Sequence, residues 1–458
     1  MTHVIDYRNR IILAPMVRVG TLPMRLLALH YGADLVYSEE LIDYKLLKCK
    51  RIENELLGTV DYIDDDYQIV FRTCEKEKGQ VILQVGTCSP ERAVQVAKFV
   101  EKDVAGIDVN MGCPKEFSLK GGMGAALLTQ REKVKAILTS LVQCTHLPVT
   151  CKIRVLEKLE DTISLGKLIE STGVKAIAVH GRTKEERPQH ANRNYVIKAM
   201  AESLTIPVIA NGGCGEIKSF DDIELFRQAT GAASVMIARQ AESNCSIFCR
   251  DGLKPLDDVI KSYLTFAIEY DNRATNTKYC VQQMLGSLQE SERGKQLLAS
   301  QQMEEICVLW DMTSAYNAKQ KELHYMAKKA RELSNNEQSL ERSLKKCKVG
   351  NDEIWQMEAK FVRNMFDMAN LPKTVLINWT RKNNYPHPSY KTEGIEKSFR
   401  STVMVNGKKY SSTHLEKNKK YAEQAAAVVA LFALGLIDKS MIRGNAAGLP
   451  VSASCRLE

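Results

Sequence analysis

Two residues that could do chemistry follow a short apolar stretch at positions 105–109. Asn110 carries a carboxamide that can donate and accept hydrogen bonds together, and three residues later Cys113 carries a thiol ahead of Pro114. A cysteine thiol has an ordinary pKa of about 8.5, so near neutral pH it holds a proton that it can give away. The pair predicts recognition of a planar, amide-like ring edge and protonation of that ring. A buried cysteine at an ordinary strand-to-loop turn is the simpler alternative.

Eight β-rich runs alternate with helical stretches between residues 10 and 241. Nearly continuous apolar strands that alternate with helices indicate a parallel sheet covered on both faces, and eight such units match a (β/α)8 TIM barrel. A doubly wound sheet is the alternative, but no G-x-G-x-x-G fingerprint follows the first run. The runs lie at residues 11–16, 33–39, 81–87, 106–111, 149–154, 176–181, 208–212 and 234–239.

Polar residues fall at the ends of these runs, where barrels of this kind carry their chemistry. Lys152 with Arg154, and His180 with Arg182, are each two residues apart, so each pair shares one face or edge. Neighbouring cationic groups of this kind favour an anionic or electron-rich ligand. The last two runs end in the positions where this fold usually binds phosphate, which are Asn211, Gly212, Gly213, Ala238 and Arg239.

Composition limits the class of protein. The 458 residues predict two or three domains, and thirteen singly placed cysteines without a C-x-x-C pair argue against a disulfide framework and a cysteine-ligated metal site. The N-terminus lacks the apolar core of a signal peptide, and the longest apolar run, 425–437, is too short to cross a bilayer. We therefore expect a cytoplasmic monomer without a metal or a membrane contact, and the sequence identifies no protein partner.

The net charge of +9 is concentrated near the C-terminus. Residues 372–436 hold eleven Lys and Arg, four Glu and no Asp, so this segment alone carries +7. Such a concentration predicts a polyanionic partner. The expected domains are a barrel at 1–250, a helical domain at 251–333, a charged linker at 334–358, a basic α-β-β-β-α unit at 359–437 and a tail at 438–458.

Taken together, these residues resemble the tRNA-dihydrouridine synthases, and closely their type-2 branch, which carries a double-stranded RNA-binding domain. The resemblance covers residues 10–250 and the basic unit, and in the barrel it rests on five short motifs. These are Ala14-Pro15-Met16, Asn110-Met111-Gly112-Cys113-Pro114, Lys152-Ile153-Arg154, His180-Gly181-Arg182 and Asn211-Gly212-Gly213. The resemblance implies that a uracil in the tRNA D-loop, at position 20, is reduced to 5,6-dihydrouracil by FMN in the barrel mouth, with NADPH or NADH as reductant.

The resemblance also assigns roles to single residues. Asn110 would hold the uracil edge, Cys113 would protonate C5 after hydride reaches C6, and Lys152, Arg154 or Arg182 would stabilise charge on a carbonyl oxygen. Contacts to FMN would come from Ala14, Pro15, Met16, Gln84, Lys152, His180, Asn211, Gly212, Gly213, Ala238 and Arg239. Contacts to tRNA would come from Lys360, Arg363, Lys373, Lys417, Lys419 and Lys420.

One departure from the family pattern concerns RNA binding. Double-stranded RNA-binding domains usually carry a Gly-Pro-x-His loop between their first two strands, whereas residues 391–397 here read Lys-Thr-Glu-Gly-Ile-Glu-Lys. This difference favours a tRNA-specific mode over general duplex binding. Two alternative functions stay open from the sequence, namely a flavoenzyme that reduces free pyrimidines and a non-catalytic RNA-binding regulator.

Overall fold

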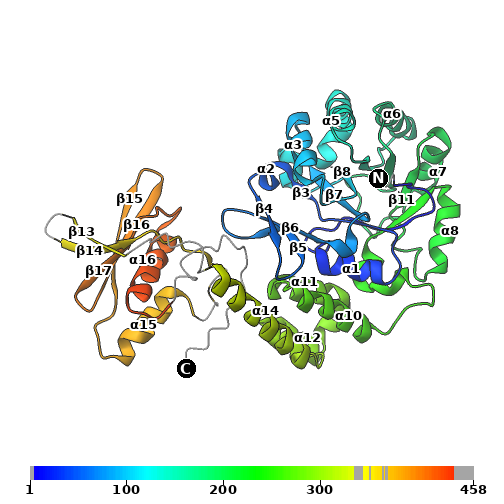
Figure 1. The fold of residues 1–458 in the computed structure, drawn as a ribbon. Helices are drawn as coiled ribbons and strands as arrows, with labels where there is room; N and C mark the ends of the chain where they lie inside the picture. Colours follow the sequence, from blue (N-terminus) through cyan, green and yellow to red (C-terminus); the bar gives the residue numbers. More distant parts are fainter. Residues whose placement is uncertain (1–4, 335–343, 350–351, 364–365, 367–369, 438–458) are drawn as a thin grey trace. The chain divides into compact units, whose positions relative to one another are not determined.

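The computed structural model describes residues 5–334, 344–349, 352–363, 366 and 370–437 (Figure 1). The chain forms two compact units, one of Met1–Asp64 with Ile69–Glu322 and one of Asp65–Gln68 with Leu323–Glu458. Each unit is described separately below.

The first unit is built on a closed parallel barrel. The order β2-β1-β12-β11-β10-β9-β8-β7 closes on itself because β2 also pairs with β7, and every one of these pairings is parallel. The structure thereby confirms the eight predicted strands and the TIM barrel. The strands are β1 Ile11–Leu13, β2 Leu35–Tyr37, β7 Val81–Gly86, β8 Gly106–Met111, β9 Val149–Arg154, β10 Ala176–His180, β11 Val208–Asn211 and β12 Ser234–Ile237.

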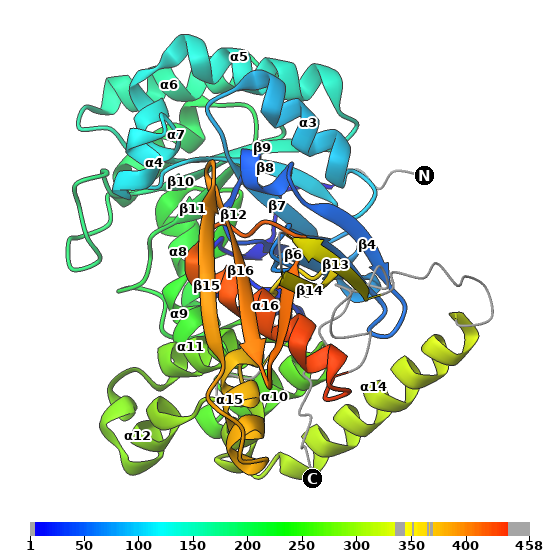
Figure 2. The ribbon, with the colours of Figure 1, turned by 90° about the vertical axis from the view of Figure 1, so that its left-hand side faces the viewer.

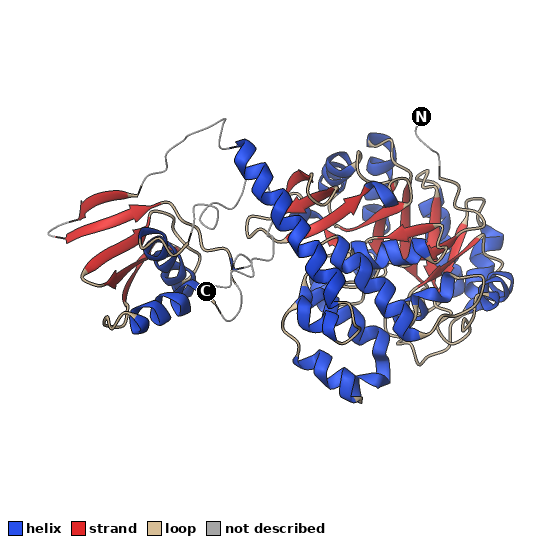
Figure 3. Ribbon diagram, turned by 60° about the horizontal axis from the view of Figure 1, so that its bottom comes forward, coloured by secondary structure: helices blue, strands red, loops and turns tan. Residues whose placement is uncertain are grey.

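Helices follow the strands and cover the outside of the barrel (Figures 2 and 3). Local signals set their limits: Ser89 caps the helix that begins at Pro90, and Gly231, with φ of 58°, ends the helix before β12. These helices are α1 Leu22–His30, α3 Pro90–Val100, α5 Arg131–Cys144, α6 Leu159–Glu170, α7 Asn194–Ser203 and α8 Asp221–Thr230, with the short α2 Asp43–Leu46, α4 Glu116–Lys120 and α9 Arg239–Ser243.

Two apolar cores form because side chains on a strand alternate between its faces. Ile12, Ala178 and Met236 belong to the cluster inside the barrel, whereas Leu13 and Val179 belong to the larger cluster between strands and helices. Both faces of each strand are therefore buried, which is the reason the strands read as nearly continuous apolar runs in the sequence.

An antiparallel sheet that the sequence analysis did not anticipate is inserted between β2 and β7. It consists of β4 Lys50–Asn54, β5 Thr59–Ile63 and β6 Ile69–Cys74, and it follows the short strand β3 Leu41–Ile42, which pairs with β7. Its strands mix charged with apolar residues, so they lack the continuous apolar character that marked the barrel strands.

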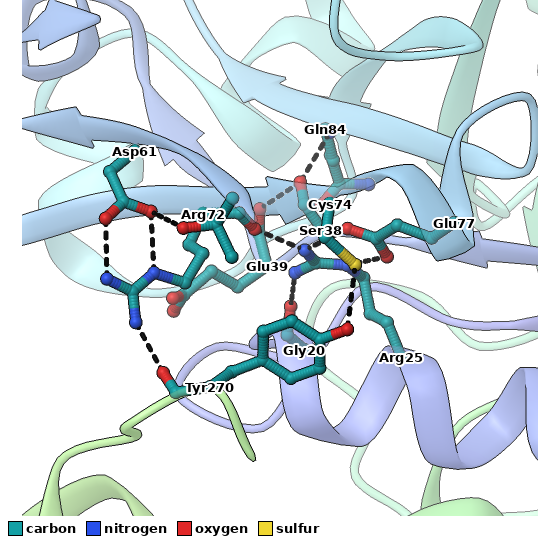
Figure 4. A network of polar contacts seen from close by, with 11 residues as sticks. Gly20, Arg25, Ser38, Glu39, Asp61, Arg72, Cys74, Glu77, Gln84 and Tyr270 are labelled. Atoms are coloured by element: carbon teal, nitrogen blue, oxygen red, sulfur yellow. Dashed lines mark hydrogen bonds and ion pairs between the residues drawn. The ribbon is translucent and has the colours of Figure 1, made fainter. Parts of the chain in front are cut away.

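Two buried ion pairs fasten this insertion to its surroundings (Figure 4). Arg72 binds Asp61 at 2.6 Å and donates to the carbonyl oxygen of Tyr270, and Arg25 of α1 binds Glu77 at 2.6 Å. All four charged side chains are at least nine-tenths buried. Removing one partner of such a pair leaves an uncompensated buried charge, which costs about 3–5 kcal/mol. The pairs therefore hold the insertion, α1 and the start of the following helical region in one arrangement.

Helices dominate the segment after the barrel. They are α10 Leu256–Glu269, α11 Ala274–Leu285, α12 Glu292–Ala299, α13 Met303–Val308 and α14 Thr313–Ser334. Helix α10 packs on α1, and α11 packs on α9, so the helical region continues the apolar core of the barrel. In the described part of the chain, no helix combines the length and apolarity needed to cross a membrane.

The second unit has its own sheet, with the order β13-β14-β17-β16-β15. Helix α16 packs on β16 and β17 and helix α15 packs on α16, around a separate apolar core. This arrangement confirms the predicted α-β-β-β-α unit. Its elements are α15 Pro372–Lys382, β15 Ser389–Ile395, β16 Ser398–Val405, β17 Lys408–Ser412 and α16 Lys419–Ala433.

The segment expected to be a linker contains two of the strands in this sheet. β13 Lys345–Val349 and β14 Asp352–Met357 form a hairpin, and β14 pairs in parallel with β17. The lysine-rich composition obscured these strands in the sequence, but Met357 belongs to the apolar core of this unit and Trp355 packs against it. Residues 335–343 and 350–351 of the expected linker, and the expected tail at 438–458, lie outside the described residues.

Candidate active site

A chain of hydrogen bonds runs through the barrel interior towards the turn that carries Cys113. Asp108 of β8 is fully buried; its Oδ1 accepts from the Thr150 hydroxyl at 2.7 Å and its Oδ2 accepts from Gln84 Nε2 at 2.8 Å. Gln84 Oε1 in turn accepts from Asn110 Nδ2 at 2.9 Å. Asp108 and Asn110 are two residues apart on one strand and share its inward face, so they can be linked through Gln84.

Asn110 fixes the turn itself. Its Oδ1 accepts the backbone N–H groups of both Gly112 and Cys113, each at 2.9 Å. The sequence predicted that this carboxamide reads the edge of a ligand, whereas here both ends of the amide already have protein partners. Its visible role is to shape the segment that presents the thiol, and the predicted ligand contact stays a prediction.

Cys113 lies in a partly buried position at the end of β8. Its carbonyl oxygen accepts from the N–H of Ala125, and Gly124, with φ of 58°, lets the glycine-rich loop approach it closely, since a Cβ there would lie 2.6 Å from that oxygen. Burial, together with the nearby charge of Glu40, raises the pKa of the Cys113 thiol above its ordinary value. The sulfur therefore keeps its proton at neutral pH, as a proton donor must.

A cavity of about 270 Å³ opens beside this turn, at the carboxyl ends of β9 to β12. It is lined by four arginines and by Gly212 and Gly213, and cationic side chains beside glycine backbone suit a phosphate or another anion. Many of the predicted site residues line it together, namely Arg154, His180, Arg182, Asn211, Gly212, Gly213, Ala238 and Arg239.

The cations around the cavity act on each other. Burial, with the charge of Arg154, lowers the pKa of Lys152 to about 7, although Asp108 opposes this shift. Burial, followed by the charge of Lys152 and of nearby arginines, lowers the pKa of His180 well below its usual range. His180 is therefore neutral at physiological pH, and the positive charge of the cavity comes from its arginines.

Two arginines connect the loops that form the wall of the cavity. Arg154 donates to the carbonyl oxygens of Gly112 and Thr183, each at 2.8 Å, so it joins the Cys113 turn to the loop after β10. Arg182 is buried and donates to the carbonyl oxygens of His190 and Gly212, each at 2.8 Å, and to that of Pro188 at 3.3 Å. The sequence predicted substrate contacts for both arginines, and in this structure most of their donors are committed to backbone.

The backbone at Gly212 cannot carry a side chain. It has φ of 117°, and a Cβ there would lie 2.1 Å from Oδ1 of Asn192 and 2.9 Å from the ring of His180. Oδ1 of Asn192 is buried and has no hydrogen-bond partner among the described residues. A buried acceptor without a partner, close to a glycine cradle, is a feature that a ligand with donor groups would satisfy.

The other predicted barrel residues lie at neighbouring strand ends but do not line this cavity. Ala14, Pro15 and Met16 follow β1, and Lys152 lies opposite Asn110 in the register of β8 with β9. The sequence analysis missed Asp108, Asn192 and Glu40. Asp108 had a visible signal, because a carboxylate inside an apolar strand two residues before Asn110 needs polar partners. Within the described ranges, no group of three or more His, Cys, Asp or Glu could hold a metal ion.

The predicted RNA contacts fall in the second unit. Lys419 and Lys420 open α16 and, like Lys417, are exposed. Lys373 instead pairs with Glu423 and lies over the ring of Tyr390 at 4.5 Å, so it helps to hold α15 against its neighbours. Lys360 and Arg363 lie between β14 and α15 and are partly buried. Residues 391–395 of the expected loop belong to β15, and only Glu396 and Lys397 form the turn between β15 and β16.

The raised pKa of the buried Asp108 carboxyl predicts that the stability of the protein depends on pH. Burial raises the pKa of Asp108 from 3.8 to about 6, so between these values the folded protein keeps a proton that the unfolded chain has lost. This contribution to stability is complete below the lower value and is lost as the pH rises through the higher one. The difference in free energy of unfolding between wild type and Asp108→Asn should therefore fall by roughly 3 kcal/mol from about pH 4 to pH 7 in urea titrations. Asp221→Asn, at an exposed position, should run parallel to wild type; parallel curves for Asp108→Asn would contradict the prediction.

Comparison with known proteins identifies the family of this site. Residues 12–346 match the family model described as dihydrouridine synthase, and residues 372–434 match the double-stranded RNA binding motif. The first match spans the barrel, the helical region and the start of the second unit.

Similar proteins agree with these matches. The tRNA-dihydrouridine(20) synthase [NAD(P)+] of Schizosaccharomyces pombe is 40% identical over 301 residues, which cover 63% of this chain and 62% of that protein. The protein with the same name in Saccharomyces cerevisiae is 36% identical over 301 residues, which cover 61% of this chain and 78% of that one. A crystal structure described as the tRNA-dihydrouridine(20) synthase dsRBD domain is 38% identical and covers 18% of this chain and 92% of that one, with a TM-score of 0.18. By the family match and the barrel that carries it, this chain belongs to the dihydrouridine synthase family.

Proposed function

We propose that this chain reduces a uridine of tRNA to 5,6-dihydrouridine with NAD(P)H as the source of electrons, at position 20 of the D-loop. The observation that carries the proposal is the protonated, half-buried thiol of Cys113, on a turn whose backbone Asn110 holds beside a cation-rich cavity. The names of the two yeast relatives support the substrate, the position and the reductant. A cytoplasmic location and a monomeric state remain predictions.

The cavity residues fit FMN as the bound cofactor. Gly212, Gly213, Ala238 and Arg239 would hold its phosphate, because they offer close backbone approach and a guanidinium in one place. The neutral imidazole of His180 and the partly ionised Lys152 would lie nearer the ring, with Pro15 and Met16 at the end of β1. When bound, FMN supplies the hydride that the reduction adds to C6 of the uracil.

The protein's own part in the reaction is to place a proton opposite C5 of the uracil. Cys113 holds that proton on sulfur, and Asn110 fixes the backbone of the turn so that the thiol has a defined position. Negative charge that develops on a uracil carbonyl oxygen would be stabilised by the cations at the ends of β9 and β10. Lys152 would contribute most, because Arg154 and Arg182 donate to main-chain carbonyl oxygens.

The second unit would deliver the RNA. The exposed lysines at the start of α16 combine positive side chains with a helix N-terminus, which together favour phosphate groups. The two-residue turn between β15 and β16 is too short to reach into a minor groove, which supports contact with one face of a folded tRNA. A target uridine inside folded RNA must leave its stack before it can enter the barrel.

The RNA-binding motif and the names of the relatives favour this proposal over the reduction of free pyrimidines. A non-catalytic regulator would not need a shielded thiol beside the cavity. Both alternatives predict that tRNA treated with the enzyme and NADPH gains no mass.

Replacement of Cys113 tests the chemistry. Cys113→Ala removes the proton donor, so dihydrouridine formation should fall by about 10²–10⁴-fold while the bound flavin is kept. The measurement is the increase of two mass units in one uridine of unmodified tRNA. Cys144→Ala, at an exposed position on α5, is the matched control and should behave as wild type. Full turnover by Cys113→Ala would contradict the assignment.

Replacement of Gly212 tests the cofactor. A methyl group at Gly212 would meet Asn192 and His180 in a backbone conformation that disfavours side chains, so Gly212→Ala should lower the flavin content of the purified protein. The ratio of flavin absorbance to protein measures this effect. Gly215→Ala adds the same methyl group where nothing lies within 4 Å, and it should keep the wild-type flavin content.

Replacement of lysines tests the RNA contact. The pair Lys419→Ala and Lys420→Ala should weaken tRNA binding and reduce the slope of log affinity against log salt by up to about 2, because fewer counterions are released. Lys408→Ala with Lys409→Ala removes the same amount of charge at the start of β17. This double variant should change the tRNA affinity and the salt slope less. The flavin content should be unchanged in both double variants, and equal salt slopes would exclude phosphate contacts at the start of α16.

A further inference from the structure

A second cavity, of about 250 Å³, lies at the carboxyl ends of β1 and β2. It is bounded by the segments that follow these two strands, by β6 and by the loop between α10 and α11. Its wall includes Ser38, whose hydroxyl oxygen accepts the backbone N–H of Gln84 at 3.0 Å. The second cavity therefore borders the hydrogen-bond chain that leads to the Cys113 turn, and the proposed function so far gives it no role.

The second cavity differs in charge from the cavity at the ends of β9 to β12. Two of the arginines that line it, Arg25 and Arg72, belong to the buried ion pairs of the insertion, so their charge is already matched (Figure 4). Two carboxyl groups, of Glu39 and Asp271, line it as well. Its wall also carries two aromatic rings and two amides, which are those of Phe71, Tyr270, Asn272 and Asn276. This mixture suits a flat, neutral heterocycle better than a phosphate.

Arg18 lines the second cavity in an unusual backbone conformation. Its φ is 69°, which lies in the left-handed region that favours glycine. The N–H of Arg18 donates to Oε2 of Glu39 at 2.8 Å, and its carbonyl oxygen accepts from Nδ2 of Asn276 at 2.6 Å. Side chains from two distant segments thus hold this main chain in place. Strain that the surroundings maintain in this way is concentrated at functional sites.

The side chain of Arg18 forms a flat surface at the opening of this cavity. Its guanidinium carbon lies over the ring of Tyr279 on α11, 3.8 Å from the ring centre. Arg18 is exposed, and within the described part of the chain its guanidinium makes no hydrogen bond. The tyrosine therefore supports one face of a guanidinium whose donors are not used by the protein. Guanidinium planes stack on nucleobases as they do on aromatic side chains.

We propose that Arg18 stacks on a nucleobase of the RNA that lies next to the target uridine, and that the second cavity receives this base. The inference rests on the proposed function, in which a uridine leaves its stack to enter the barrel. When that uridine leaves, the faces of its neighbouring bases are exposed, and an exposed base is stabilised by a flat partner. Arg18 would hold the neighbouring base while the uridine reaches the Cys113 turn.

The test combines a change in the protein with a change in the RNA. Dissociation constants of the whole protein are measured for unmodified tRNA and for two tRNAs that lack the base just before or just after the target uridine. In wild type, removal of one of these bases should weaken binding about fivefold or more. Arg18→Ala should bind the intact tRNA about fivefold or more weakly, and removal of the same base should then weaken binding no further, because its stacking partner is already gone.

Matched variants separate stacking from other effects. Arg18→Lys keeps the charge but loses the planar group, so it should respond to base removal as Arg18→Ala does while it keeps the wild-type salt dependence. Arg250→Ala removes an exposed arginine that lies 5.9 Å from the ring centre of Phe220, apart from the residues that line the second cavity, and it should respond as wild type. Arg18→Gly suits the left-handed backbone, so it replaces Arg18→Ala in the test if that variant does not fold.

Three results would overturn the proposal. The first is an equal effect of base removal in wild type and in Arg18→Ala. The second is equal weakening of all three tRNAs by Arg18→Ala with a salt slope smaller by about 1, which would indicate a phosphate contact. The third is slower reduction of the bound flavin by NADPH with unchanged tRNA binding, which would assign the cavity to the adenine of the reductant. The proposed function fails separately, if wild type forms no dihydrouridine, because the binding comparison does not depend on turnover.

Discussion

The burial of one carboxylate inside the barrel orders the site. Asp108 can only accept hydrogen bonds when it is ionised, so Gln84 must turn its NH2 group towards it and its carbonyl towards Asn110. Asn110 must then donate to Gln84, which leaves its oxygen free for the backbone of Gly112 and Cys113. The orientation of two amides and the shape of the Cys113 turn thus follow from a single buried acid. The shift of the pKa of Asp108 to about 6 expresses the cost of that burial.

The cavity on the other side of the turn has the opposite electrostatic character. Arg154 and Arg182 are held by hydrogen bonds to main-chain carbonyl oxygens, so these bonds position their charge without neutralising it. Local charge and burial together keep His180 neutral. A polyanionic or phosphate-bearing ligand would complete this charge balance, and that is the physical reason for expecting the cofactor to bind here rather than at another strand end.

The sequence was sufficient for the barrel because its strands are apolar on both faces and separated by helices. The sequence also predicted that Arg154, His180, Gly212 and Arg239 lie together, since strand ends converge in this fold, and the structure places all four around one cavity. It failed for β4 to β6 and for the β13–β14 hairpin, where charged residues interrupt the apolar pattern. It could not predict that Arg182 would donate to main-chain carbonyl oxygens, because this depends on loop conformation and on contacts between distant segments.

The hydrogen-bond chain from Thr150 to the Cys113 turn has a consequence for how such an enzyme can diversify. Each residue in this chain donates to one neighbour or accepts from another. A substitution at any one of them therefore changes whether its neighbours must donate or accept. Substitutions that adapt the cavity to other ligands are therefore easiest where main chain and loop tips form its wall, as at residues 183–192 and 213–217. The residues of this hydrogen-bond chain are therefore expected to change together, whereas the loops after β10 and β11 can change one residue at a time.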